Sequence, residues 1–266
     1  MSRGIWTLVL CLGVLVETAI AGRPLTIDDA DPVDPGLFEL EGGVGYHKDS
    51  GCKHWDFPLG LTYGLFQGVE GGIGFGGQID KRSEWLEDNR DRTRVRENGI
   101  GDLGLGVKWQ FFGETAWCPR QALVPSVKFP TADEDKGLGS GETDYDLTWV
   151  ASKSLSERLG AHVNAGYSWI GEPEGERMGD VVHGGLALDF QLLAALQWVG
   201  EVYAERELTG GEEPAVLGQI GLRWGVSDTL IVDCAAGARI SGEAPDFMAT
   251  VGLTWSFGFA DNGKNK

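Results

Sequence analysis

The stretch Ile100–Phe112, IGDLGLGVKWQFF, alternates between two kinds of side chain and decides the fold class. Leu103, Leu105, Val107, Trp109 and Phe111 fall on one face, and Asp102, Gly104, Gly106, Lys108 and Gln110 fall on the other. Successive side chains of a β-strand point to opposite faces, so this period of two predicts a strand with one apolar and one polar face.

The same alternation recurs along the chain, and no helical period competes with it over a comparable length. Twelve strands are predicted, at 37–47, 56–65, 68–80, 99–112, 121–130, 143–151, 160–170, 180–191, 196–208, 215–226, 230–240 and 246–259. Long connections at 48–55, 81–98, 131–142 and 171–179 contrast with very short ones at 66–67 and 227–229. Long loops at one end and short turns at the other are typical of outer-membrane barrels.

Composition excludes several other classes of protein. The chain has 266 residues and a formal net charge of −18, and binding to nucleic acid would need clustered Lys and Arg instead. A hydrophobic fraction of 42% is too high for a disordered chain, and 4 Cys are too few for a disulfide scaffold of this length. Beyond residue 21 no long apolar run remains for a membrane-spanning helix. A soluble secreted β-protein and a membrane β-barrel are left.

The polar faces decide between these two classes. They are rich in glycine, which makes up 42 of the residues and suits a curved strand better than a solvated surface. Twelve strands with one uniform apolar face would also need a very large dry core in a soluble protein. We therefore predict an all-β, transmembrane, antiparallel up-and-down β-barrel of about 12 strands over residues 37–259, with ten strands as the other count. The alternative is a soluble secreted ligand-binding β-barrel that buries its apolar face inside.

The ends of the chain lie outside the predicted barrel. Residues 1–21 combine a positive start, an apolar run at Gly4–Val16 and the small residues Ala19 and Ala21, which predicts a signal peptide cleaved before Gly22. Export would deliver the protein to the outer membrane of a Gram-negative-type bacterium. Residues 22–36 are predicted as a periplasmic N-terminal segment, with a plug folded into the barrel as the less favoured alternative. Residues 260–266 form a short polar tail.

Large aromatic residues stand near the strand ends of the apolar faces, which predicts one girdle at each membrane interface. With short turns in the periplasm, the inner girdle comprises Phe38, Trp109, Phe111, Trp149, Phe190, Trp198, Trp224, Trp255 and Phe257. The outer girdle comprises Phe57, Phe129, Tyr145, Tyr167, Trp169 and Phe247.

Charged and polar residues on the other face are candidates for lining the lumen: Glu39, Glu41, Glu70, Asp102, Lys108, Lys128, Asp144, Asp146, His162, Asp189, Glu201, Glu205, Arg223, Asp233 and Arg239. Acidic groups outnumber basic ones, which favours cations. The Glu201, Glu205 and Glu207 cluster serves either this selectivity or mere solvation.

Strand pairing brings some of these lumen residues together. Arg223 should pair with Asp233 across the short turn at 227–229. His162 is expected opposite Asp189, with His183 opposite Ser168. This separation places the two imidazoles too far apart for one metal ion. The glycine repeats lie inside strands rather than in a nucleophile elbow or a phosphate-binding loop, so we expect no catalytic, metal or cofactor site. Half of a catalytic triad, formed by His162 and Asp189, is the less favoured alternative to a lumen pair.

Two regions carry a family resemblance. They are Val124–Asp133 (VPSVKFPTAD), followed by Gly137–Tyr145 (GLGSGETDY), and Leu159–Tyr167 (LGAHVNAGY). They resemble the outer-membrane transporter family grouped with the meta-pathway of phenol degradation, in which a strand ends in Pro-Thr-Gly-Asp. Here Ala132 replaces that glycine. The ending Thr250–Phe257 (TVGLTWSF) is similar to the signal read by the barrel-insertion machinery, although nine residues follow it.

The resemblance implies a barrel over about residues 36–259 and a channel or transporter for small solutes, hydrophobic or aromatic ones included. A non-transporting barrel with a structural or surface-contact role is the alternative. The expected partners are outer-membrane lipid, the solute and the insertion machinery, with no nucleic acid. Five arginines of the 81–98 loop either contact lipopolysaccharide phosphates or stay solvated: Arg82, Arg90, Arg92, Arg94 and Arg96.

Overall fold

The computed structural model describes residues 22–49, 52–85, 92–173, 178–209 and 213–258, with the backbone alone at 82–85 and 92–94. The strands are β1 (Leu37–Lys48), β2 (Cys52–Phe66), β3 (Val69–Trp85), β4 (Arg92–Ile100), β5 (Leu103–Phe112), β6 (Arg120–Phe129), β7 (Asp144–Ser154), β8 (Leu159–Trp169), β9 (Val181–Leu193), β10 (Leu196–Glu207), β11 (Ala215–Ser227), β12 (Leu230–Ser241) and β13 (Phe247–Gly258). One short 3₁₀ helix, η1 (Glu134–Lys136), lies in the connection before β7. None of the described residues forms a helix long and apolar enough to cross a membrane.

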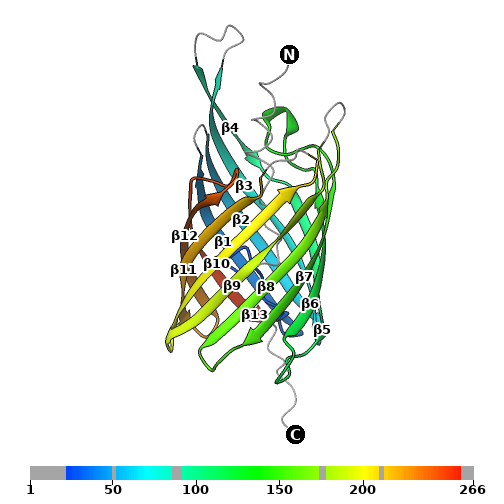
Figure 1. Cartoon of the computed structure of the whole chain (residues 1–266), viewed down its shortest axis with the longest axis vertical. Coiled ribbons are helices and arrows are strands. Elements are labelled where there is room, and N and C mark those ends of the chain that lie inside the picture. The colour runs from blue at the N-terminus through cyan, green and yellow to red at the C-terminus, as the bar shows by residue number, and fades with distance from the viewer. Residues whose placement is uncertain (1–21, 50–51, 86–91, 174–177, 210–212, 259–266) are drawn as a thin grey trace.

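The strands form one closed antiparallel sheet (Figure 1). β1 pairs with β13 from Leu37↔Gly258 to Lys48↔Phe247, and this pairing closes the barrel. β5 pairs with the first part of β3 and β4 with the last part, so β4 and β5 together fill one position in the wall. The predicted fold, a barrel of twelve strand positions, is confirmed. Closure gives the strands of the ring from β1 to β3 and from β5 to β13 a neighbour on each side, which is the condition for strands to cross a bilayer.

The apolar face points outward along the barrel. Leu186 and Ile220 are each 61% exposed, whereas Glu70 and Lys108 on the opposite face are 2% and 3% exposed. This inverted distribution fits a barrel whose outer surface meets lipid and whose interior is polar. The soluble alternative, with its apolar face inside, is wrong for the same reason.

Aromatic rings gather near both ends of the barrel. At the end that carries the short turns (the short-turn end), the Phe38 ring stacks on Phe257 with centroids 5.4 Å apart, and Trp255 lies 4.7 Å from Phe257. At the opposite end (the loop end), Tyr167 and Trp169 lie 4.9 Å apart. The predicted grouping of aromatic residues near the strand ends agrees with this arrangement.

Two predicted loops are partly strand. β2 begins at Cys52 rather than 56, and β3 and β4 extend the ladder to Trp85↔Arg92 within the predicted 81–98 loop. This hairpin projects beyond the rim at the loop end (Figure 1). A ladder of backbone hydrogen bonds can continue where a strand has no apolar face. The strands were predicted from alternating apolar and polar residues, so their ends beyond the apolar face were not recognised. Of the arginines proposed to contact lipopolysaccharide, Arg90 lies outside the described residues.

The predicted strand 99–112 is interrupted at Gly101–Asp102, between β4 and β5. The Gly101 N–H donates to the Gly76 carbonyl at 2.8 Å. The Asp102 carboxylate accepts the Ala132 N–H at 2.9 Å, so it fixes the connection between β6 and β7 to the wall. The prediction missed this break because the apolar alternation runs through it.

The register between β8 and β9 differs from the prediction by two residues. His162 lies opposite Ala187 rather than Asp189, and His183 lies opposite Gly166 rather than Ser168. A two-residue shift keeps every side chain on its own face, so the pattern of alternation does not distinguish the two registers. Residues 1–21 and 260–266, expected as the signal peptide and the polar tail, lie outside the described residues.

Candidate functional site

Residues 22–35, here called the N-terminal segment, lie inside the barrel near the short-turn end. The prediction preferred a periplasmic segment to a plug, and the contacts in the structure place the segment in the lumen instead. The wall meets its backbone with polar side chains: Val33 N–H donates to Glu70, Ala30 N–H to Ser152 (2.9 Å), Thr26 and Ile27 N–H to Glu201 (3.0 and 2.7 Å), and Arg23 N–H to Glu41 (3.3 Å). These partners come from strands on several sides of the barrel, so the segment crosses the lumen.

Backbone carbonyls of the segment are satisfied in the same way. Gln110 Nε2 donates to the Ala30 carbonyl at 3.0 Å, and Gln219 Nε2 donates to the Pro24 carbonyl at 3.1 Å. With its amide oxygen turned toward the segment, Asn164 pairs with both backbone groups of Asp28 at 2.8 and 3.0 Å. Buried backbone groups need such partners, and the lumen wall supplies them.

Apolar side chains also anchor the segment. Ile27 and Leu25 pack with Ala187 and Val199, and Val199 is fully buried. Ala30 packs separately against Val150 and its neighbours on β6. The lumen therefore contains two small apolar patches that match apolar residues of the segment, which explains why these lumen-facing positions are not polar.

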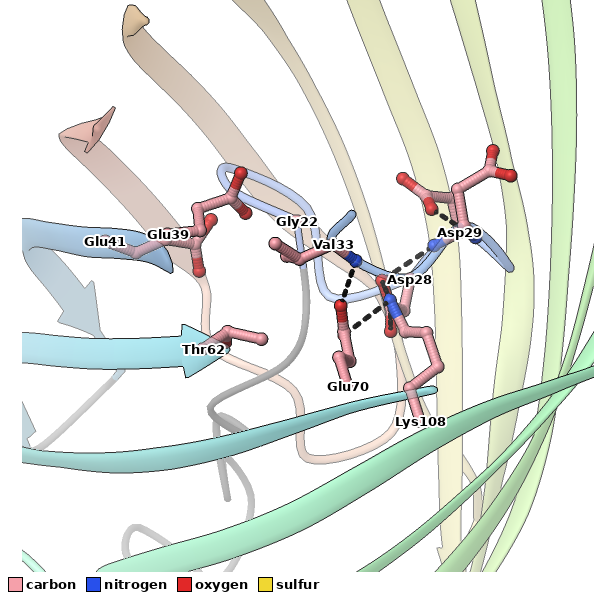
Figure 2. A pocket seen from close by; sticks show the side chains of 10 residues that line it. Gly22, Asp28, Asp29, Val33, Glu39, Glu41, Thr62, Glu70 and Lys108 are labelled. Atoms are coloured by element: carbon pink, nitrogen blue, oxygen red, sulfur yellow. Dashed lines mark hydrogen bonds and ion pairs between the residues drawn. The ribbon is translucent and has the colours of Figure 1, made fainter. Parts of the chain in front are cut away.

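Lys108 is the central buried charge of the site. Its ammonium lies 2.9 Å from Asp28 Oδ2 and 3.4 Å from Glu70 Oε1, and all three side chains are less than 10% exposed. Figure 2 shows the ammonium between the two carboxylates. A buried charge is tolerated when it is paired and hydrogen-bonded, so both carboxylates depend on the ammonium and the ammonium depends on them.

Arg23 occupies a separate position on the wall formed by β1, β12 and β13. Its Nη2 donates to Thr250 Oγ1 at 2.7 Å, and its guanidinium lies 3.4 Å from the Asp233 carboxylate. Arg223 was predicted to pair with Asp233, and the predicted register is present. However, Arg223 donates to the Arg23 and Gly22 carbonyls at 2.6 and 2.7 Å, because the segment supplies Arg23 as the ionic partner of Asp233.

A small cavity of about 50 Å³ remains between the segment and the wall formed by β1, β2, β3 and β5 (Figure 2). Carboxylates dominate its lining, with Lys108 as the basic residue: Asp28, Asp29, Asp31, Glu39, Glu41 and Glu70. Thr62, Val33 and Gly22 complete the lining. Because like charges are concentrated there, the electrostatic potential of this gap favours cations.

Closer to the loop end, ionic side chains on the inner wall pair with one another. Lys128 bridges Asp144 at 2.6 Å and Asp102 at 3.4 Å. His183 Nε2 lies 2.7 Å from Asp146 Oδ2, which also accepts the Ser168 hydroxyl at 2.8 Å. These contacts link β6 to β7, and β7 to β8 and β9.

His162 and Asp189 lie close together despite the changed register. The two side chains are diagonal neighbours on one face, and His162 Nε2 lies 2.7 Å from Asp189 Oδ2. His162 Nδ1 lies 2.9 Å from the Ser152 hydroxyl, whose oxygen accepts the Ala30 N–H. The three side chains therefore link the wall to the N-terminal segment.

The remaining candidates have different surroundings. Glu201 accepts from the segment and from Gln219, and Glu205 contacts the Tyr203 hydroxyl. Arg239 pairs with Asp246 at the loop end, where both side chains are about one-third exposed. Within the described residues no group of three or more His, Cys, Asp or Glu side chains is arranged to hold a metal ion.

In the described connections between strands, the carboxyl groups of Glu114 and Asp133 have shifted pKa values. Glu114 lies in the turn between β5 and β6, and a hydrogen bond from Lys153 near the end of β7 lowers the pKa of Glu114 below its usual range. Lys136 lowers the pKa of Asp133 in the same way, in the loop that contains η1.

Sequence reasoning missed Arg23, Asp28, Ser152, Asn164 and Gln219 as parts of this site. Asn164 falls on the predicted polar face but was not counted among the candidates, and Gln219 alternates with apolar neighbours in the same way. Ser152 lies just beyond the predicted strand 143–151. Arg23 and Asp28 belong to a segment without period, so no pattern assigned them to the lumen.

Comparison with known proteins places this architecture in a family. The family model described as "Putative MetA-pathway of phenol degradation" matches residues 43–257. The chain belongs to this family. No curated protein matches its sequence.

Solved structures resemble the chain in fold. An outer membrane channel from Pseudomonas putida F1 superposes with a TM-score of 0.65 at 12% identity, covering 86% of this chain and 98% of that one. The NanC porin gives 0.58 at 10% identity, covering 81% and 98%. The translocator domain of the autotransporter NalP from Neisseria meningitidis gives 0.55 at 14% identity, covering 86% and 91%. At these identities the likeness supports the fold of the family member described here.

Proposed function

We propose that this family member is an outer-membrane channel for small solutes whose lumen favours cations over anions. The observation that carries the proposal is the gap between the N-terminal segment and the wall, which six carboxylates and one lysine line. Two solved structures of similar fold are an outer membrane channel and a porin, which supports transport as the function of the barrel. An acidic constriction raises the local concentration of cations and repels anions.

Reversal potentials in a planar bilayer test this selectivity. In a salt gradient the wild-type protein should show a potential of the sign expected for cation preference. The double substitution Glu39→Gln and Glu41→Gln removes two carboxylates of the gap and should reduce that preference. Glu157→Gln, in the exposed turn between β7 and β8, is the matched control and should leave it unchanged. An unchanged potential in the double variant would contradict the selectivity.

A second candidate is a channel for aromatic or other hydrophobic solutes, which the family description favours. If phenol enters the lumen, millimolar phenol should interrupt the single-channel current reversibly. A current unaffected by phenol would leave small hydrophilic cations as the better class of solute. A barrel that passes no ions at all would favour the structural or surface-contact alternative.

We assign the chain no catalytic role. Ser152, His162 and Asp189 share hydrogen bonds, but the Ser152 side chain is fully buried and its oxygen accepts the Ala30 N–H. The contacts of this trio serve to hold the segment. A nucleophile would need access to a substrate and a base free to take its proton.

The proposed setting is the outer membrane of a Gram-negative-type bacterium, reached by export and by the barrel-insertion machinery. The outward apolar belt and the two aromatic groups support lipid as a partner. Lipopolysaccharide contact by the β3–β4 hairpin remains part of the proposal. Mass spectrometry of the purified protein should give a chain that starts at Gly22 if the signal peptide is removed as predicted.

A further inference from the structure

The guanidinium of Arg23 lies in a cradle built by three neighbouring strands. Asp233 on β12 and Thr250 on β13 contact it, and the side chain of Asp233 is 1% exposed. Asp233 and Gly252 are register partners, and Gly252 is in turn the partner of Gly43 on β1. Four positions on three strands therefore converge on one planar cation.

The two glycines make room for the guanidinium. A Cβ atom added at Gly43 would lie 2.5 Å from Arg23 Nη2, and one added at Gly252 would meet Arg23 Nε. For both glycines the three nearest atoms belong to the Arg23 side chain, and none belongs to the backbone. The glycines therefore shape the space for this group rather than the turn or packing of the strands.

The fit between Arg23 and Asp233 is incomplete. Arg23 Nε and Asp233 Oδ2 are 3.4 Å apart, and both buried atoms lack a hydrogen-bond partner. Arg23 Nη2 also lies 3.4 Å from Asp233 Oδ1, so both contacts of the guanidinium with this carboxylate are long. Arg23 is tethered to a segment that the other wall contacts hold in place. A guanidinium that is free of the chain could form the parallel pair of hydrogen bonds that this carboxylate accepts best.

We propose that this cradle is a binding site for solutes that carry a guanidinium group, and that Arg23 occupies it as an internal ligand. A solute would exchange with Arg23 and remove one anchor of the N-terminal segment. Gly43 and Gly252 select a flat cation by leaving space over the wall, and Asp233 and Thr250 accept its N–H groups. This inference specifies a solute class for the proposed channel, but binding at the cradle does not require transport.

Calorimetric titration of the full chain in detergent micelles with methylguanidinium tests the site. Arg23→Ala empties the cradle, so this variant should bind methylguanidinium more tightly than the wild type, in which Arg23 competes. Asp233→Asn and Gly252→Ala, each combined with Arg23→Ala, should weaken binding by at least about tenfold, because they remove the charged acceptor and the space. Methylammonium, which lacks the planar fork, should bind the Arg23→Ala variant more weakly.

Gly104→Ala combined with Arg23→Ala is the matched control, because a Cβ there would lie 3.8 Å from the nearest atom. It should bind like the Arg23→Ala parent. Equal binding of methylguanidinium to the parent and to the Gly252→Ala and Asp233→Asn variants would overturn the site, as would equal binding of the two cations. Because no flux is measured, a channel that fails to conduct would refute the proposed function and leave this result standing.

Discussion

At the scale of single residues, Lys108 connects the N-terminal segment to the barrel. It pairs with Asp28 of the segment and Glu70 of β3, so one ammonium compensates two buried carboxylates. Removal of one partner from a buried ionic group leaves uncompensated charge, which is more costly than the pair itself is stabilising. The barrel ladder does not depend on this contact, but the position of the segment does.

Lys108→Met should therefore lower the free energy of unfolding by up to about 3–5 kcal/mol and raise the conductance as the segment detaches. Denaturant titration in lipid vesicles and bilayer recording measure the two effects. Lys153→Met removes a half-exposed partner of Glu114 and serves as the control, with an expected change below about 1 kcal/mol. Similar losses for both variants would contradict the role given to Lys108.

Glu114 gives a prediction about acidity. Its pKa is lowered from 4.5, first by the hydrogen bond from Lys153, so its carboxyl should titrate below 4.5 in the folded protein. The stability from this contact is present above the unfolded pKa and is lost as the pH falls through the lowered folded pKa. NMR titration of the labelled carboxyl measures the value. Lys153→Met should return it toward 4.5, and a value at or above 4.5 in the wild type would refute the contact.

At the scale of elements, the strands could be predicted from the sequence and the N-terminal segment could not. Alternation in a stretch such as Leu103–Phe112 depends only on local side-chain direction, so it identifies a strand without knowledge of its neighbours. The segment has no period, and its aspartates are equally compatible with a solvated tail. Its position is determined by partners distant in sequence, Lys108 and Glu201 among them.

The candidate site shows the same division. Which residues face the lumen follows from the alternation of side chains along each strand. Their partners depend on the register between strands, and the predicted β8–β9 register was wrong by two residues. The loop before β9 gave no turn signal strong enough to fix it. Arg223 illustrates the consequence: its register with Asp233 was predicted, while its contacts with the segment were not.

Deletion of Pro24–Val33 tests the segment as an element. The barrel closes through β1 and β13 without it, so the shortened protein should still fold as a heat-modifiable barrel on gel electrophoresis. Its single-channel conductance should rise several-fold, because the residues that cross the lumen are gone. Unchanged conductance would show that the segment does not limit the pore.

At the scale of the whole molecule, the apolar surroundings outside the barrel and the polar interior explain where apolar and polar residues lie. Lipid faces the Leu, Val and aromatic rows, which are exposed on the outside of the barrel. The interior holds paired charges, glycine and one extended peptide segment. Closure of the sheet satisfies the backbone of the wall, and the side chains of the wall satisfy the backbone of the segment.

The most direct test of this account is a disulfide between the segment and the wall. Ala30 N–H donates to Ser152 Oγ at 2.9 Å, so Ala30→Cys and Ser152→Cys should place two thiols within bonding distance. Cys52, Cys118 and Cys234 are replaced by serine to prevent other pairs. The account predicts that this disulfide forms in the folded barrel and keeps the conductance low. Reduction of the disulfide should let the conductance rise, with the conductance of the deletion variant as the upper limit. Failure of the two cysteines to join in the folded protein would contradict the placement of the segment inside the lumen.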